Sequence, residues 1–246
     1  MDEQGLIIFD LDGTLVDSMA LHATKFAQIL KERHGIAEKI SRQAYYDMSG
    51  NPLGLQFERA IRSQGVEGPQ ATEEYVQDFY ARIRQVDPVL FPDVTPALEK
   101  LCQAGYWLAV CSGNAPDIVE KRLAQTGIMP YFRLWLGTDP AQGLRKGEPH
   151  FKLLRQRLAL SRDDFMRNSM SVGDAQHDIQ VAQEAGILSV ARVNRFNAAT
   201  LHEIHPDYLI TDLTELISLL KKPGDPRNEY LTIAALKDNH RSNEHR

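Results

Sequence analysis

Short apolar runs, each followed at once by polar or glycine residues, recur along this chain. The first, Leu6-Ile7-Ile8-Phe9, stops at Asp10-Leu11-Asp12-Gly13. Runs of this length that end in a turn are typical of strands buried on both faces, as in a parallel sheet. Four later runs have the same form, at residues 106–111, 170–172, 187–193 and 208–210. Segments with helical spacing lie between them, so the sequence predicts an α/β fold, a doubly wound, Rossmann-like parallel sheet.

The stretch from about residue 16 to residue 90 breaks this alternation. Seventy residues between two strands of one sheet are too many for a loop, so they must form a domain of their own. Apolar residues recur in it at helical spacing, for example Met19, Ala23, Phe26 and Leu30. We expect an α/β core domain at 1–15 and 91–222, an inserted all-helical cap at 16–90, and a polar C-terminal extension at 223–246 with a short helix near 230–236.

Charge and composition narrow the class of protein. The 246 residues hold 28 Lys and Arg against 33 Asp and Glu, a formal net charge of −5. This balance lacks the basic footprint of a protein that binds nucleic acid or an anionic membrane. The longest apolar run, 106–111, is far too short to span a bilayer, and the first residues do not resemble a signal peptide. We expect a cytoplasmic protein that acts on small molecules and has no obligate protein partner.

Polar side chains follow three of the predicted strands at the point where each strand ends. Asp10 and Asp12 come after the first, Ser112 and Asn114 after the second, and Asp174 after the third. Open α/β sheets bind ligands at the carboxyl edge of their strands. One aspartate in such a place is often only a turn former or helix cap. The meeting of several on one edge predicts a functional site.

The charges indicate what this site holds. Asp10, Asp12, Asp174 and Asp178 bring up to four negative charges together, and their repulsion is relieved if some of their pKa values rise or if a cation binds. A hard divalent cation is the simpler solution. Oxygen ligands alone favour Mg²⁺, which commonly takes one or two carboxylates, water and a substrate phosphate. The sequence therefore predicts a Mg²⁺ site and a small phosphorylated substrate.

These residues resemble the four motifs of the haloacid dehalogenase superfamily. The matching segments, in order along the chain, are Asp10-Leu11-Asp12-Gly13-Thr14-Leu15, Ser112-Gly113-Asn114, Lys146, and Gly173-Asp174 with Asp178. The helical insert after the first motif resembles the C1 cap of the phosphoglycolate phosphatase-like branch. The similarity extends from about residue 6 to residue 220.

The resemblance implies roles for the core residues. Asp10 would be the nucleophile that forms an aspartyl-phosphate and a metal ligand, and Asp12 the general acid/base, whose backbone carbonyl also helps to hold Mg²⁺. Asp174 would ligate the metal directly, and Asp178 directly or through water. The remaining pair, Ser112 and Lys146, would hold the phosphoryl oxygens.

Other positions are candidates for substrate binding by the same resemblance, and alternatives remain open for several. Thr14 and Gly113 belong to the core motifs. Asn114 could equally be a plain helix N-cap. From the cap, Asn51 lies in a loop that in the family faces the active site, and His22 lies on an apolar helix stripe where it could instead be a packing residue.

The basic motif departs from the usual Lys-Pro. Here the segment reads Arg145-Lys146-Gly147-Glu148-Pro149, which makes Arg145 a competing candidate for the phosphate contact.

The leading functional prediction is a Mg²⁺-dependent phosphatase for a small phosphorylated metabolite, similar to phosphoglycolate or a sugar phosphate. A phosphomutase is the first alternative, because the same aspartyl-phosphate can pass to a second hydroxyl; Thr14 favours hydrolysis by resemblance. A non-catalytic regulatory or binding protein is the second alternative. Dehalogenase and phosphonatase activities are disfavoured, because those relatives lack an aspartate at the position of Asp12.

Overall fold

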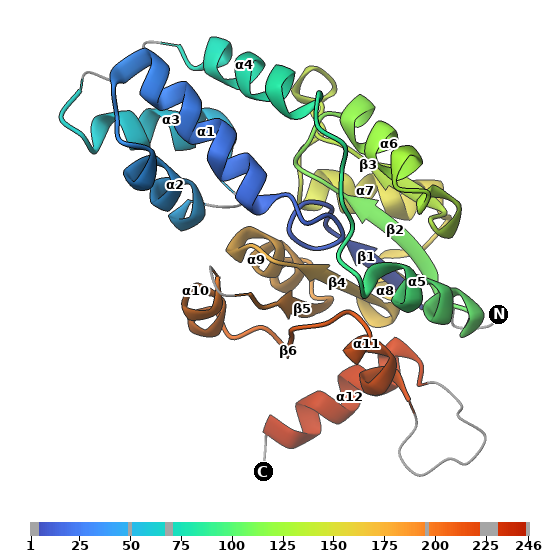
Figure 1. The fold of residues 1–246 in the computed structure, drawn as a ribbon. Coiled ribbons are helices and arrows are strands. Elements are labelled where there is room, and N and C mark those ends of the chain that lie inside the picture. Colours follow the sequence, from blue (N-terminus) through green and yellow to red (C-terminus); the bar gives the residue numbers. More distant parts are fainter. Residues whose placement is uncertain (1–4, 49–50, 67–70, 195–196, 222–230, 245–246) are drawn as a thin grey trace. The chain divides into compact units, whose positions relative to one another are not determined.

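The computed structural model describes residues 5–48, 51–66, 71–194, 197–221 and 231–244 of the chain (Figure 1). The chain divides into two compact units. Unit 1 comprises Met1–Val16 and Leu90–Arg246, and unit 2 comprises Asp17–Val89. Each boundary of unit 2 lies one residue inside the expected insertion. The assignment of a catalytic role to one unit and a cap role to the other stays a prediction.

A six-stranded parallel sheet forms the centre of unit 1, in the order β3-β2-β1-β4-β5-β6. The strands are β1 (Leu6–Phe9), β2 (Trp107–Cys111), β3 (Leu134–Leu136), β4 (Ser169–Gly173), β5 (Leu188–Arg192) and β6 (Tyr208–Ile210). The first strand in sequence is thus flanked by β2 and β4, which are far from it along the chain. The predicted α/β fold is confirmed. Strand β3 is not among the five apolar runs from which the sheet was predicted.

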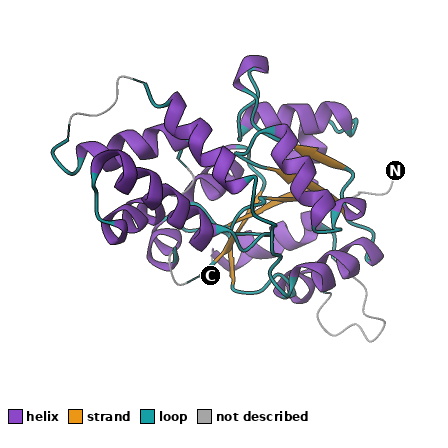
Figure 2. Cartoon of the chain, turned by 45° about the horizontal axis from the view of Figure 1, so that its top comes forward, coloured by secondary structure: helices purple, strands orange, loops and turns teal. Residues whose placement is uncertain are grey.

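Helices lie on either side of these strands (Figure 2). Alternate side chains of β1 enter different hydrophobic clusters: Ile7 and Phe9 join one, and Leu6 and Ile8 join the other. This alternation follows from the period of two in a strand, and it explains why the whole run is apolar. The helical elements of unit 1 are α5 (Val94–Gln103), α6 (Pro116–Gln125), η1 (Met129–Tyr131), η2 (Pro140–Gln142), α7 (Glu148–Arg157), α8 (Arg162–Asn168), α9 (Gln176–Glu184), α10 (Ala198–Glu203), α11 (Glu215–Leu220) and α12 (Ile233–Glu244).

The last helix, α12, differs from the expected short segment near 230–236. It runs to Glu244, and its Ile233 and Leu236 join the cluster that contains Ile7 and Phe9. Lys237 extends the attachment, because its ammonium donates to the backbone carbonyl of Met166 at 2.8 Å and to that of Gly186. Contacts distant in sequence therefore hold a helix that extends beyond the short segment predicted.

Unit 2 contains four helices and no strand among its described residues: α1 (Met19–His34), α2 (Glu38–Asp47), α3 (Leu53–Arg62) and α4 (Glu73–Ile83). Its core is aromatic: Phe26 stacks on Phe57 with ring centroids 4.3 Å apart, and Tyr45 and Phe79 pack beside them. This confirms the all-helical insertion. Across the described part of the chain, no helix has both the length and the apolar character needed to cross a membrane.

Candidate active site

The topology of the sheet brings the sequence motifs of unit 1 together. Asp10 directly follows β1, and its amide donates to the carbonyl of Val172 in β4 at 2.9 Å. Ser112 directly follows β2 and Asp174 directly follows β4, the two strands that pair with β1. Because all three strands are parallel, their carboxyl ends lie at one edge.

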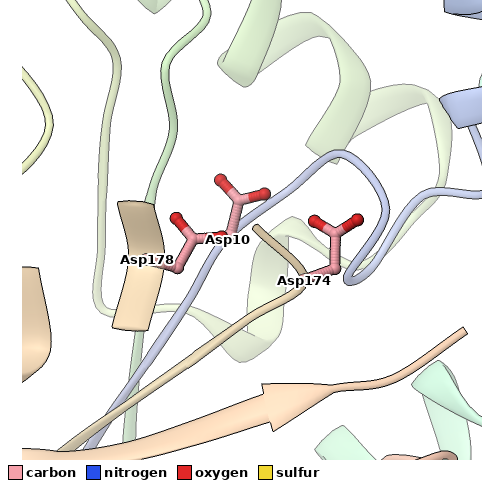
Figure 3. A group of neighbouring side chains, drawn as sticks. All are labelled: Asp10, Asp174 and Asp178. Carbon is pink, nitrogen blue, oxygen red and sulfur yellow. The ribbon is translucent and has the colours of Figure 1, made fainter. Parts of the chain in front are cut away.

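Three carboxylates meet at this edge, from Asp10, Asp174 and Asp178 (Figure 3). One oxygen of each lies within 4.8 Å of the others, and the side chains are almost fully buried. Asp178 comes from the first turn of α9, where its Oδ2 also accepts the amide of Ala175 at 3.0 Å. The capping contact fixes the position of this carboxylate.

Two glycines let the backbone approach these carboxylates closely. Gly13 has a φ of +82°, and a Cβ there would lie 2.1 Å from Oδ2 of Asp174. A Cβ on Gly173 would lie 2.3 Å from the side chain of Asp178. Any larger residue would displace a carboxylate, so the glycines of both motifs are required by the packing of the site.

The surroundings of the carboxylates oppose their ionisation. Burial raises the pKa of Asp10 to about 7; the ammonium of Lys146 acts against this shift, and the charge of Asp178 adds to it. Burial and then the charges of Asp10 and Asp178 also raise the pKa of Asp174 well above its ordinary value. A bound cation in addition to Lys146 would lower the free energy needed to keep these buried carboxylates ionised.

The donor set fits a hard divalent cation. All three candidate ligands are carboxylate oxygens that lie within 4.8 Å of one another, and none is nitrogen or sulfur. Such a set suits Mg²⁺ or Ca²⁺ rather than a softer metal. Asp10, Asp174 and Asp178 are therefore the residues that would hold the ion.

Lys146 is the basic residue that the structure brings to the triad. Its ammonium pairs with Asp10 at 2.5 Å and with Asp178. Burial works against its charge, but the two carboxylates outweigh this and raise the pKa of Lys146 above its ordinary value. Arg145, the competing candidate, is exposed. The change from Lys-Pro to Lys-Gly thus leaves the lysine in place, with Gly147 at a φ of +108°.

Asp12 is held by a separate set of contacts. The amide of Asn114 donates to its Oδ2, and the guanidinium of Arg122 pairs with its Oδ1. Asn114 is not the helix N-cap that the sequence allowed: Ala115 holds that position, and the Asn114 amide also reaches Oγ of Ser112 at 3.2 Å. Asn114 therefore contacts both Asp12 and Ser112, and substrate binding by it stays a prediction.

Arg122 was not among the residues selected from the sequence. It lies in α6 on the same face as the buried residues Ile118, Val119 and Leu123, and it is itself only 7% exposed. A charged residue on the apolar face of a helix needs a buried partner. That pattern was the signal in the sequence that could have identified it.

The remaining core candidates lie beside these groups. Thr14 is fully buried, its Oγ1 has no hydrogen-bond partner among the described residues, and its carbonyl accepts from Arg192 at 2.9 Å. Gly113 is exposed, with open space around the position of a Cβ. Substrate contact by either residue stays a prediction.

The two cap candidates have different environments within unit 2. His22 is buried: its Nδ1 lies 3.3 Å from the hydroxyl of Tyr45, and its ring packs edge-on against Phe79. These contacts fit the packing role that the sequence left open. Asn51 is exposed, and its amide donates to the carbonyl of Met48 at 3.1 Å. A role for either in substrate binding remains to be tested.

The family of the chain follows from its similarity to known proteins. Residues 7–192 match the family described as haloacid dehalogenase-like hydrolase. The chain belongs to this family. A phosphoglycolate phosphatase of Pectobacterium atrosepticum is 31% identical, over 92% of this chain and 96% of the relative. One from Vibrio parahaemolyticus is 28% identical, over 87% of this chain and 95% of that protein.

Solved structures of the family share the fold. The chain superimposes with a TM-score of 0.71 on the structure of a predicted phosphoglycolate phosphatase from Haemophilus somnus 129PT, at 25% identity, covering 89% of this chain and 99% of that one. A haloacid dehalogenase-like hydrolase from Streptococcus pneumoniae gives a TM-score of 0.71 at 23% identity, with coverage of 89% and 99%, which bears on the fold alone.

Proposed function

We propose that this chain is a Mg²⁺-dependent phosphatase that hydrolyses a small phosphorylated metabolite, with phosphoglycolate as the first substrate to test. The observation that carries the proposal is the triad of Asp10, Asp174 and Asp178 beside Lys146, within 4.8 Å of one another at the carboxyl edge of the sheet. Membership of the hydrolase family and the names of the relatives support it.

In the proposed first step, a carboxylate oxygen of Asp10 attacks phosphorus. The phosphorus–oxygen bond to the leaving group breaks, and Asp12 gives its proton to the departing oxygen. In the second step Asp12 takes a proton from water, whose oxygen attacks the aspartyl-phosphate and restores the carboxylate of Asp10. A bound divalent cation supplies charge that offsets the carboxylates and the phosphate.

The remaining residues would bind the phosphoryl group. Lys146 is a partly buried ammonium beside the proposed nucleophile, and hydrogen bonds from such a group to phosphate oxygens are stronger than those between neutral groups. Ser112 offers a hydroxyl that already accepts hydrogen bonds from Asn114. Because Lys146 pairs with Asp10 in this structure, substrate phosphate would share that ammonium with the nucleophile.

The test is release of inorganic phosphate from phosphoglycolate, a panel of sugar phosphates and p-nitrophenyl phosphate. Protein freed of metal by EDTA should be inactive, and Mg²⁺ should restore activity; Ca²⁺ serves as the matched divalent control. A phosphomutase would move phosphate between hydroxyls without releasing it, and a non-catalytic binding protein would release none. Full activity in chelator would contradict the metal requirement, and no activity with any ester would contradict the proposal itself.

A further inference from the structure

The cations of the site are divided between its carboxylates. Lys146 pairs with Asp10 and Asp178, whereas Arg122 pairs with Asp12. Asp12 also stands outside the carboxylate triad that fits a metal. The Arg122 contact is therefore distinct from the carboxylates that would hold the metal, among them the proposed nucleophile.

The setting of Arg122 restricts its movement. Its side chain is 8% exposed and that of Asp12 is 15% exposed. Ionised groups removed from water need close partners, and a guanidinium offers a planar donor group with a fixed direction. Arg122 is fixed by α6, whose first residue comes two positions after Asn114. One short segment of chain thus supplies a partner for each oxygen of the Asp12 carboxylate.

A carboxylate held at both oxygens has a defined orientation. General acid catalysis needs the donor within hydrogen-bond reach of the leaving oxygen, and small errors in position cost large factors in rate. Neither contact supplies a new reacting group. Both determine where the Asp12 carboxyl group points.

We propose that Arg122 is a positioning residue that orients Asp12 for proton transfer to the leaving group. The proposal rests on the proposed phosphatase function. It implies that Arg122 matters most when the leaving oxygen needs a proton. A phenolate made stable by a nitro group leaves without one, whereas an unsubstituted phenolate is more basic and depends on the acid.

The experiment compares kcat/KM for p-nitrophenyl phosphate and phenyl phosphate, because this constant reports the steps through cleavage of the ester bond. For Arg122→Met we expect phenyl phosphate to lose about tenfold to a hundredfold, and p-nitrophenyl phosphate less than about threefold. Lys121→Met is the matched control, because Lys121 is an exposed lysine in the same helix. Lys121→Met should leave kcat/KM unchanged for both esters.

Two further variants separate positioning from folding. Arg122→Lys keeps the charge without the planar donor group, so it should melt close to the wild type and show a smaller loss with the same preference for phenyl phosphate. In an Asp12→Asn background, Arg122→Met should cause no further selective loss, because the acid it orients is gone. Circular dichroism and thermal melting accompany each variant.

The outcomes are distinct. Equal losses on both esters in Arg122→Lys at an unchanged melting temperature would overturn the positioning role, and so would a selective loss that persists beside Asp12→Asn. Wild-type protein inactive on both esters with Mg²⁺ would instead overturn the phosphatase function and this proposal with it. An active wild type with an unselective Arg122 variant would overturn this proposal alone.

Discussion

Asp10 combines two properties that conflict in a protein without a bound cation. As the proposed nucleophile it must be ionised, yet burial and the neighbouring carboxylates raise its pKa to about 7. The contact with Lys146 partly offsets this rise in pKa, because the ammonium stabilises the ionised carboxylate. A bound divalent ion would lower the pKa of Asp10 further. Metal binding and ionisation of the proposed nucleophile are therefore expected to be linked.

Replacing Asp10 by asparagine tests the nucleophile. The amide keeps the shape of the side chain but lacks the attacking charge, so turnover should fall by at least about a thousandfold while circular dichroism stays unchanged. The measurement is phosphate release at saturating Mg²⁺. Turnover near the wild-type rate would mean that another residue attacks phosphorus.

His150 predicts a pH dependence of stability. It is fully buried, its Nε2–H donates to the carbonyl of Gly137 at 3.0 Å, and burial lowers its pKa to about 4. The unfolded chain takes up this proton near pH 6.5, roughly the value for an unperturbed histidine. The contribution of neutral His150 to the free energy of unfolding is therefore fully present above about pH 6.5. As the pH falls to about 4, the protein loses up to about 3 kcal/mol of this stability.

The measurement is the free energy of unfolding in urea between pH 7 and pH 4, roughly the range over which a histidine with this shift titrates. His150→Gln keeps a donor but does not titrate, so the difference between wild type and variant isolates the histidine. A difference that does not change over this range would contradict the buried, neutral state of His150.

At the scale of elements, the turn that follows β1 determines the geometry of the triad. Gly13→Ala should displace the carboxylate of Asp174 and reduce kcat/KM by about a hundredfold, the order expected for a misplacement of about 1 Å. Calorimetry should show weaker binding of Mg²⁺ by the same variant.

Gly127→Ala is the matched control. Gly127 also has a positive φ, +73°, but no atom lies within 4 Å of its Cβ position. Both variants should lose about 1–2 kcal/mol of stability from backbone strain. Only Gly13→Ala should lose activity and metal affinity, and equal activity in the two variants would contradict the packing argument.

Elements whose signal is local were predictable from the sequence. Leu6–Phe9 is continuous, apolar and ended by a turn, so both the strand and the position of Asp10 followed from it. The pairing of Asp12 with Arg122 did not follow, because the two residues are 110 positions apart and no periodic pattern connects them. Helix α12 was underestimated for the same reason, since the carbonyls that bind Lys237 come from distant segments.

At the scale of the molecule, the chain leaves and re-enters unit 1 at neighbouring points. Val16 bridges Leu90, and within unit 2 the amide of Asp17 donates to the carbonyl of Val89 at 2.8 Å. Each unit also has its own hydrophobic core. A short connection can therefore replace the insertion without straining the sheet.

We expect unit 1 to fold when residues 17–89 are replaced by a short glycine-serine linker. Because Asp10, Asp174 and Asp178 all belong to unit 1, its affinity for Mg²⁺ should stay within about threefold of that of the full chain. Titration calorimetry and circular dichroism measure this. An unfolded or aggregated product would show that unit 1 depends on the insertion.

The central place of β1 in the sheet also has a consequence for biosynthesis. The strand leaves the ribosome well before one of its partners, β4, which begins only at Ser169. Unit 2 is complete long before then. The nascent chain therefore carries an apolar strand with at least one unpaired edge until β4 has been synthesised, which is the state that chaperones protect from aggregation.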